Sequence, residues 1–446
     1  MEDINLTLEN VESIVQHALL HQPITDMHTH LYPPSFGTPV PNRTGHTDAA
    51  GLMLWGIDQT LTYHYLVAEV FRVVPATQLP FEAFWKMTVT QQADHIWKTL
   101  FVQRTPISEA CRGVLTLLER LGLDPNEKTL DSYRRFFSQQ DPDDYINRVM
   151  ELSGVNSITM TNPVFDDNER QRWLGMANRG PDARFKAVLR IDPIMRDYPA
   201  AARRLHEWGY AVEPQPDAPS MAEVRCFLGE WLDRQQAIYM AVSLPPEWTY
   251  PLGPGTADVA ALSGQTVLEQ AVLPVCRERK LPLAMMIGSR LRVQPQLRDA
   301  GDMVGRADVS AVVNLCLRHP ENKFLITMLS RENQHELCVA ARKFGNLMIF
   351  GCWWFLNNPS LIDEITRMRL ELLGTSFIPQ HSDARVLDQL LYKWPHSRAC
   401  IQRALTDKYL DLLHTGLRLT QTQVQRDVRL LLADNFKDFL ARQGPV

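Results

Sequence analysis

The stretch ITDMHTH, residues 24–30, joins an apolar run of strand length to two histidines spaced two residues apart. Residues two apart on a β-strand point to the same face, so His28 and His30 are expected to project together at the end of this strand. Two imidazoles placed in this way suit a single divalent ion. The pair is either part of a metal site or an accident of composition, and the rest of the chain has to decide between the two.

Further apolar segments of strand length follow, each bounded by loop residues and most of them separated by helical periodicity. Together with the first they number eight: residues 24–30, 157–162, 186–191, 237–244, 282–288, 323–329, 347–353 and 376–382. Apolar strands that alternate with helices indicate a parallel sheet covered on both faces, and eight such units predict an α/β chain folded as a (β/α)8 TIM-type barrel. A doubly wound open sheet is the alternative, but no GxGxxG or GxxxxGK[ST] loop follows an early strand.

The first two strands are separated by a long stretch with helical patterns, far longer than a strand-to-helix connection requires. We therefore predict a helical insertion over 32–150, which follows a unit of N-terminal helix and first strand over 1–31. The remainder, 151–446, is expected to complete the barrel and to end in helices. Insertions after the first strand lie over the C-terminal face, where the active sites of this fold are found. The Pro- and Gly-rich stretch 245–264 is expected to form a loop at the same face.

Composition narrows the function classes. The 446 residues are 45% hydrophobic and carry a net charge of −5, which gives no large positive field for a nucleic acid. The seven cysteines are scattered and never form a CxxC pair, which favours reduced core thiols and a cytoplasmic location. The acidic N-terminus does not read as a signal peptide, and no charge-free run of about 18 apolar residues predicts a membrane span.

A carboxylate at the end of the last predicted strand supports the metal interpretation. Asp383, in QHSDAR (380–385), would face the mouth of a closed barrel opposite His28 and His30. Two histidines and one carboxylate predict a site for one divalent ion, zinc being the favoured choice, with positions left open for substrate. His381 shares the face of Asp383 but lies deeper, so a structural or supporting role is predicted for it instead of ligation.

With these residues in place, the chain resembles the uronate (glucuronate) isomerases of the amidohydrolase superfamily. The resemblance runs over about 20–405 and rests on ordered motifs. These are the HxH pair, the His-Tyr pair in LWGIDQTLTYHYLVAEVFR (54–72), ITMTNPVFD (158–166), VLRIDP (188–193), GCWWFLNNP (351–359) and SDARVLDQLLYKWPHSR (382–398).

The resemblance implies conversion of an aldose acid to a ketose acid, with a proton moved between C2 and C1 through an enediol. It implies one divalent ion on His28, His30 and Asp383, which polarises the sugar oxygens. It assigns catalytic roles to Asp383, His64, Tyr65 and Arg385, and substrate-binding roles to Arg190, Trp353 and Trp354. The expected partner is a small-molecule sugar acid, without nucleic acid or membrane, and the chain is a possible homo-oligomer.

The chain departs from the family pattern at Met286, where HIG after strand five has become MIG. A thioether neither ionises nor donates a hydrogen bond, so the role of that imidazole is missing. Two other functional classes remain as alternatives to the isomerase. One is a metal-dependent hydrolase of a sugar-acid lactone, amide or ester, disfavoured because strands four to six bring no histidine. The other is a sugar-acid binding protein without turnover, disfavoured because His28, His30 and Asp383 are all present.

Overall fold

The computed structural model describes residues 4–37, 51–176 and 182–442, and within them the predicted α/β barrel is confirmed. Its parallel strands are β1 (Ile24–Thr29), β2 (Val155–Met160), β3 (Phe185–Ala187), β4 (Leu189–Arg190), β5 (Met240–Leu244), β6 (Leu283–Ile287), β9 (Phe324–Met328) and β10 (Leu347–Ile349). β5, β6 and β9 are buried along their whole length, as expected for strands covered on both faces.

The third barrel strand is divided between two ladders. β3 pairs with β2, and β4 pairs with β5, so the sheet changes partner at Val188. Backbone hydrogen bonds on either side of this change link the strand to both neighbours. The Val188 amide donates to the Met160 carbonyl of β2, and the Leu189 amide donates to the Tyr239 carbonyl just before β5. The strand order therefore continues without a break from β1 through β2, β3–β4, β5, β6 and β9 to β10.

The eighth predicted strand, 376–382, is less regular than expected. It pairs with β10 through one parallel bridge, between Phe350 and Ile378. It closes the barrel against β1 through two backbone bonds, from the Asp383 amide to His28 at 3.0 Å and from the His30 amide to Ala384 at 2.7 Å. Pro379 lacks an N–H group, which limits the ladder this segment can form.

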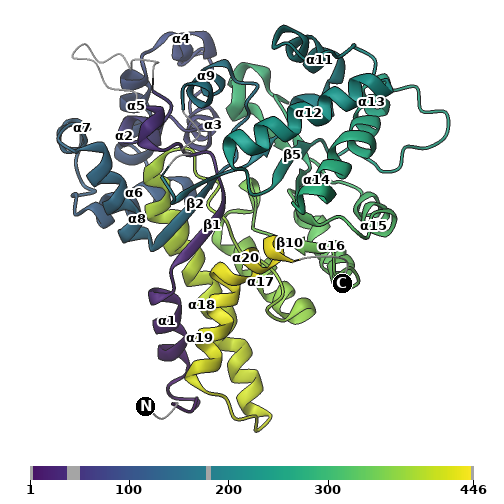
Figure 1. Cartoon of the computed structure of the whole chain (residues 1–446). Helices are drawn as coiled ribbons and strands as arrows, with labels where there is room; N and C mark the ends of the chain where they lie inside the picture. Colours follow the sequence, from purple (N-terminus) through teal and green to yellow (C-terminus); the bar gives the residue numbers. More distant parts are fainter. Residues whose placement is uncertain (1–3, 38–50, 177–181, 443–446) are drawn as a thin grey trace.

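Helices fill the described part of the connection between β1 and β2. They are α2 (Ile57–Leu61), α3 (His64–Val73), α4 (Phe81–Lys86), α5 (Val89–Trp97), α6 (Glu109–Leu121), α7 (Asp131–Ser138) and α8 (Pro142–Ser153). α8 illustrates why they form: Asp141 caps its first amides, Pro142 opens its first turn and Gly154 ends it in the left-handed region. Figure 1 shows these helices (blue) gathered on one side of the barrel. The division at 31 and 150 into separate units stays a prediction.

The remaining helices surround the barrel and extend from one end of it. They are α1 (Val11–His21), α9 (Asp167–Gly175), α10 (Asp192–Arg196), α11 (Tyr198–Glu207), α12 (Ala218–Gln235), α13 (Val259–Val267), α14 (Leu273–Arg279), α15 (Val309–Arg318), α16 (Gln334–Ala341), α17 (Pro359–Leu373), α18 (Leu390–His414), α19 (Gln421–Arg429) and α20 (Asn435–Ala441). α1 packs on α18 and α19, and the three project together below the sheet in Figure 1.

The predicted loop over 245–264 is only partly a loop. Asp258 caps a helix that begins at Val259, so the last six residues of the stretch are helical. The helical run Val259–Arg279 is also long and apolar enough, by length and composition, to cross a membrane, although half of its most apolar window is buried. It packs against α10, α11 and α12, as a core helix does.

The barrel interior is filled by a core of its own. Met27, Tyr239, Met286, Leu325 and Phe350 belong to one buried cluster that comes from strands around the barrel. A filled interior leaves the carboxyl ends of the strands as the place for a site. The seven cysteines are all free, and only Cys226 is exposed, in agreement with the expectation of unpaired core thiols.

Candidate active site

His28, His30 and Asp383 come together where β1 meets the eighth barrel segment. The Nε2 atom of His28 lies 3.1 Å from the Asp383 Oδ1 atom, and the Nε2 atom of His30 lies 3.4 Å from the same oxygen. His28 and Asp383 are buried, whereas the His30 side chain keeps 26% of its surface exposed. Asp383 has a φ of 51°, a left-handed conformation that is uncommon outside glycine and is found at functional sites.

Burial and mutual contact set the protonation states of these groups. Burial lowers the pKa of His28 to about 4, so its imidazole is neutral near pH 7. Burial alone would raise the pKa of the Asp383 carboxyl, but the imidazoles of His28 and His30 hold that pKa well below its usual range. A neutral imidazole and an ionised carboxylate are the forms that ligate a metal ion.

His381 joins this group more closely than its sequence context predicted. Candidate ligand atoms of His28, His381 and Asp383 all lie within 4.8 Å of one another. The rings of His28 and His381 meet edge to face, with centroids 4.9 Å apart. Sequence reasoning placed His381 on the correct face but assigned it a supporting role, because the depth of an irregular segment cannot be read from spacing.

The donor set fits a divalent ion of the zinc type. Imidazole nitrogens and one carboxylate oxygen are ligands that zinc accepts. Both ring nitrogens of His381 are buried and have no hydrogen-bond partner within the described residues. Buried polar atoms are rarely left without a partner, so these nitrogens point to a group that the protein chain does not itself provide.

The turn that carries Asp383 is held from behind by α18 and β1. The Lys393 ammonium donates to the carbonyl oxygens of Ser382 at 2.7 Å and Asp383 at 3.3 Å. The Asp26 carboxylate accepts the Ser382 amide at 3.1 Å and the Trp394 indole N–H at 2.8 Å. Lys393 and Asp26 thereby fix the backbone that aims the Asp383 carboxylate, and Trp394 holds Asp26 in place.

His64 and Tyr65 open α3 and lie beside the same turn. The Lys393 Nζ atom lies over the Tyr65 ring, 5.9 Å from its centroid. The ring centroids of His64 and of Trp354, which follows β10, are 5.6 Å apart. The His64 Nε2 atom and the Tyr65 hydroxyl are both buried without a hydrogen-bond partner within the described residues. Burial lowers the pKa of His64 to about 3 and raises that of Tyr65 well above its ordinary value, so both are neutral.

Arg385 provides a guanidinium that no carboxylate of the described chain pairs with. Its Nη1 atom donates to the carbonyl oxygens of His30 at 3.4 Å and Leu52 at 3.2 Å, and its Cζ atom lies 5.3 Å from the centroid of the Tyr32 ring. The Tyr32 hydroxyl donates in turn to the buried Glu169 carboxyl at 3.0 Å. Within the described residues, the positive charge of Arg385 is therefore not compensated by a carboxylate.

Arg190 differs from Arg385 because its charge is already compensated. It forms a two-pronged pair with Asp192, at 2.8 and 3.1 Å, and donates to Ser243 at 2.8 Å and to the Thr161 carbonyl at 3.2 Å. Four of its five N–H groups are used in this way, and the fifth has no partner within the described residues. The prediction that Arg190 binds substrate is thus narrowed to a single hydrogen bond.

With this geometry described, comparisons with solved structures identify the family. A uronate isomerase from Bacillus halodurans C-125 is 48% identical, with 98% of each chain covered and a TM-score of 0.90. This chain belongs to the uronate isomerase family. A glucuronate isomerase from Caulobacter crescentus (15% identity, coverage 98% and 95%, TM-score 0.73) and a uronate isomerase from Thermotoga maritima (12%, 97% and 97%, 0.74) share the fold. Comparisons with family models and with curated proteins found no match.

The two tryptophans assigned to substrate binding occupy different places in this member of the uronate isomerase family. Trp353 is 4% exposed and belongs to the cluster that fills the barrel interior. Trp354 faces His64, and its indole N–H is buried without a partner within the described residues. Trp354 is therefore the better placed of the two to meet a sugar oxygen, whereas Trp353 packs as core.

Met286 lies in the barrel interior, at the position where the family pattern predicts histidine. It stands on β6, opposite Ser243 on β5 and Thr327 on β9, and it is 1% exposed. The thioether packs within the interior cluster and supplies no charge there. Any role of an imidazole at this position has to be met by other groups of the site.

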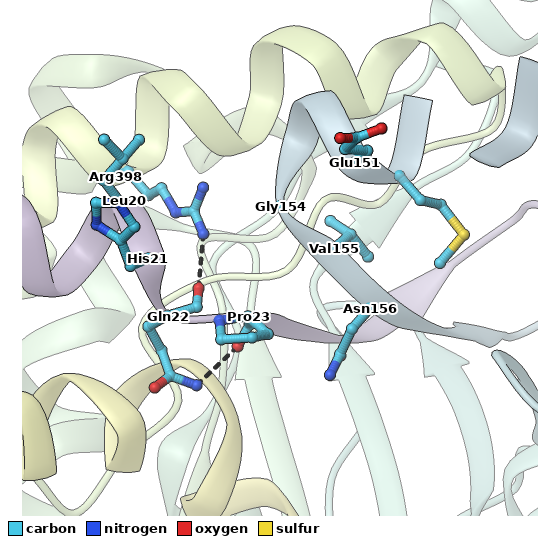
Figure 2. A pocket seen from close by; sticks show the side chains of 10 residues that line it. Leu20, His21, Gln22, Pro23, Glu151, Gly154, Val155, Asn156 and Arg398 are labelled. Carbon is cyan, nitrogen blue, oxygen red and sulfur yellow. Dashed lines mark hydrogen bonds between the residues drawn. The ribbon is translucent and has the colours of Figure 1, made fainter. Parts of the chain in front are cut away.

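A cavity of about 230 Å³ lies at the opposite end of the barrel and is unrelated to this site. Its lining residues include Pro23, just before β1, and Gly154 and Val155, at the start of β2. Figure 2 shows the Arg398 guanidinium donating to the Gln22 carbonyl beside it, at 2.7 Å. Residues at the amino ends of barrel strands serve stability, and Arg398 has this structural role.

Proposed function

We propose that this chain is a metal-dependent aldose–ketose isomerase that acts on a hexuronate of the glucuronate or galacturonate type. The observation that carries the proposal is the convergence of His28, His30 and Asp383 beside an Arg385 guanidinium that pairs with no carboxylate of the described residues. The 48% identity to a uronate isomerase from Bacillus halodurans supports the same substrate class. A uronate offers that guanidinium a carboxylate and offers the histidine cluster its polar oxygens.

The reaction requires two proton movements. The C2–H bond breaks and a C1–H bond forms, while the proton of the C2 hydroxyl is transferred to the C1 oxygen. A cis-enediol lies between the aldehyde acid and the keto acid, so no oxidant or reductant is consumed. The site therefore needs a base beside C1 and C2, donors for the two oxygens, and an anchor for the distal carboxylate.

Asp383 has the properties required of the base. Its carboxylate is ionised because contact with His28 and His30 holds its pKa well below the usual range. The backbone that carries it is fixed by Lys393 and Asp26, which limits the loss of orientation during the reaction. Asp383 accepts the proton from C2 and returns it to C1.

Tyr65 and His64 serve the sugar oxygens. The buried phenol of Tyr65 and the buried Nε2 atom of His64 lack partners within the described chain, so they are free to bond substrate. As neutral groups they donate or accept hydrogen bonds without placing a second full charge beside Asp383. They thereby carry the proton that passes between the C2 and C1 oxygens.

His28, His30 and Asp383 would hold one divalent ion, for which we propose zinc. When bound, such an ion supplies positive charge beside the sugar oxygens and stabilises the enediolate. Arg385 grips the distal carboxylate or neighbouring hydroxyl oxygens, since a guanidinium offers planar paired donors. Trp354 and the remaining N–H of Arg190 complete the substrate contacts.

A direct assay tests the proposal. Metal-loaded protein incubated with D-glucuronate or D-galacturonate in deuterated water is expected to yield the ketose, with solvent deuterium at C1 where the proton exchanges on Asp383. NMR of the product measures both the yield of ketose and the deuterium content at C1. Metal content of the purified protein, determined in the same preparation, identifies the ion. Failure of the loaded protein to isomerise either uronate would contradict the proposal.

Two substitutions separate the roles of base and anchor. Asp383→Asn should lower kcat by about 10²–10⁴-fold, because general base catalysis and an ionised ligand are lost together. Arg385→Met should chiefly raise KM and lower kcat/KM by about 10–100-fold, the worth of a hydrogen bond to a charged group. Both variants should keep the wild-type circular dichroism spectrum. If the two variants changed kcat and KM to the same extent, the assignment of Asp383 as base and Arg385 as anchor would be wrong.

A metal-dependent hydrolase is the alternative, and the strand ends argue against it. The inward positions near the ends of β5, β6 and β9 carry Ser243, Met286 and Thr327, which provide no histidine to activate water. Hydrolysis of a sugar-acid lactone, amide or ester by a protein that isomerises no uronate would favour this alternative.

The remaining expectations stay predictions. We propose a small-molecule sugar acid as the partner, a cytoplasmic location, and no binding to nucleic acid or membrane, with a homo-oligomer as a possible assembly. The net charge of −5 supports the absence of a nucleic-acid partner.

A further inference from the structure

His381 occupies a position that packing does not account for. The side chain is fully buried, and neither ring nitrogen has a hydrogen-bond partner within the described residues. Its neighbours are the His28 ring, 4.9 Å away between centroids, and the Phe350 ring, 5.5 Å away. An imidazole always carries at least one N–H donor, so burying it against an aromatic ring without a partner costs free energy that an apolar side chain would avoid.

The backbone across from His381 makes room for this ring. A Cβ atom on Gly351, which follows β10 with a φ of 66°, would lie 1.9 Å from the His381 Cδ2 atom and 2.5 Å from its Nε2 atom. Any other residue at position 351 would thus displace the imidazole. Glycine at this point keeps the ring where one of its nitrogens lies within 4.8 Å of candidate ligand atoms of His28 and Asp383.

The distances suit a shared ion. Candidate ligand atoms of His28, His381 and Asp383 lie within 4.8 Å of one another. Ligands of one tetrahedral zinc ion lie about 2.0–2.2 Å from it, and so about 3.3–3.6 Å from each other. Side-chain rotations that bring the three atoms closer together by up to about 1.5 Å would place them on one ion.

We propose that His381 is a ligand of the divalent ion, so that four side chains of this chain, His28, His30, His381 and Asp383, enclose it. The inference rests on the metal dependence proposed above and adds a ligand to it. His381 closes the inner side of the site, while His30, the most exposed of the four, lies toward the mouth. A fourth protein ligand would bind the ion more tightly than three do, and Asp383 keeps its proposed role as the base.

Metal binding by the full chain tests the assignment. Protein stripped of metal is titrated with Co²⁺ in competition with a chelator, for the wild type, His381→Leu and the control His95→Leu. His95, in α5, also has a buried Nε2 atom without a partner within the described residues, so its replacement removes a comparable group away from the site. His381→Leu should raise the Kd for Co²⁺ by more than about 100-fold, beyond the ~10–100-fold typical of groups that only support a ligand.

The visible spectrum of bound Co²⁺ gives a readout that packing would not move. Loss of one imidazole should change the shape and intensity of the ligand-field bands in His381→Leu, whereas His95→Leu should give the wild-type spectrum. A Kd within threefold of the wild type together with a superimposable spectrum in His381→Leu would overturn the proposal.

Thermal unfolding guards against a folding defect. Because the leucine removes unpartnered polar atoms, the metal-free variant should unfold at or above the wild-type temperature, and the increase on adding Co²⁺ should shrink. A lower metal-free unfolding temperature with the full Co²⁺ increase would mean that His381 only packs, which contradicts the inference. Should the leucine variant fail to fold, His381→Asn is measured in the same way.

Failure of this inference can be told apart from failure of the proposed function. If wild-type protein isomerises uronate while His381→Leu binds Co²⁺ normally, the ligand assignment alone is wrong. If His381→Leu loses Co²⁺ affinity while the wild type turns over no uronate, the ligand assignment holds and the proposed substrate is wrong.

Discussion

Tyr65 carries a hydroxyl whose burial costs stability, which makes its presence informative. The oxygen is buried and has no hydrogen-bond partner within the described residues. Such a group is retained when it serves another purpose, and here it lies beside the turn that carries Asp383.

We expect Tyr65→Phe to lower kcat by about 10²-fold or more while leaving the unfolding temperature unchanged or higher. The physical reason is that phenylalanine removes an unpartnered hydroxyl and a hydrogen-bond donor for the substrate at the same time. Calorimetry and steady-state kinetics on the same preparation measure the two effects. Tyr239→Phe is the matched control, because its hydroxyl donates to the Met27 carbonyl and its loss should lower stability. A loss of stability in Tyr65→Phe would show that its hydroxyl is structural.

Glu169 makes stability depend on pH. Burial raises its pKa to about 8, although Trp173 and Tyr32 donate hydrogen bonds to it. The unfolded chain has a pKa of about 4.3 at this group, so between about pH 4 and 8 the native state holds the extra proton and loses stability as pH rises. Asp166 strengthens this effect and Arg385 weakens it.

Glu169→Gln should therefore be more stable than the wild type at pH 9 by about 2–4 kcal/mol, with a much smaller difference at pH 5. Urea denaturation at both pH values measures the change in free energy of unfolding. Glu151→Gln, at an exposed carboxylate, serves as the control. The same difference at both pH values would show that the carboxyl does not titrate over this range.

At the residue level, sequence predicted what spacing can encode. His28 and His30 share a strand face, and Asp383 follows the last segment, so their meeting follows from strand geometry. The pairing of Arg190 with Asp192 was also within reach, since the two lie two residues apart in RIDP. The depth of His381 could not be predicted from the sequence, because it depends on how an irregular segment packs against Gly351.

Among the elements, α18 determines the orientation of the eighth barrel segment. That segment has a single ladder bridge to β10, so side chains of α18 replace the missing ladder bonds. Lys393 is the main one, because its ammonium satisfies the Ser382 and Asp383 carbonyl oxygens in a buried place. No periodicity predicts this contact, since it joins a helix to a loop, whereas the strands and the long helical connection were predicted from hydrophobic patterns.

Lys393→Met should lower the free energy of unfolding by about 1.5–3 kcal/mol, because two buried carbonyl groups lose a charged donor. It should also lower kcat, since the Asp383 carboxylate would no longer be held in one orientation. Chemical denaturation and kinetics measure the two effects, and Lys393→Arg, which keeps the charge and donors, should recover part of both. Wild-type kcat in the methionine variant would show that the turn is fixed without this lysine.

At the scale of the whole molecule, the site lies on the seam where the barrel closes. His28 and Asp383 are 355 residues apart in sequence, and the described backbone joins their segments through two hydrogen bonds. An ion bound by both segments would therefore act as a clasp between the two ends of the barrel. Loop closure over so many residues is costly in entropy, so a bond at this seam constrains the whole fold.

Removal of the ion should loosen the seam before the rest of the barrel. Treating metal-loaded protein with a chelator is expected to lower its unfolding temperature by about 3–5 °C, the effect of losing a ligand held at about 100 times its Kd. Hydrogen exchange measured by mass spectrometry should speed up most in 24–30 and 376–386, and little in β5 and β6, whose ladders do not touch the ion. Asp383→Asn, which weakens the clasp, should show the faster exchange already without chelator and respond less to it. Uniform exchange along the barrel after metal removal would mean that the seam is held by the backbone alone, and that the ion serves the substrate without stabilising the fold.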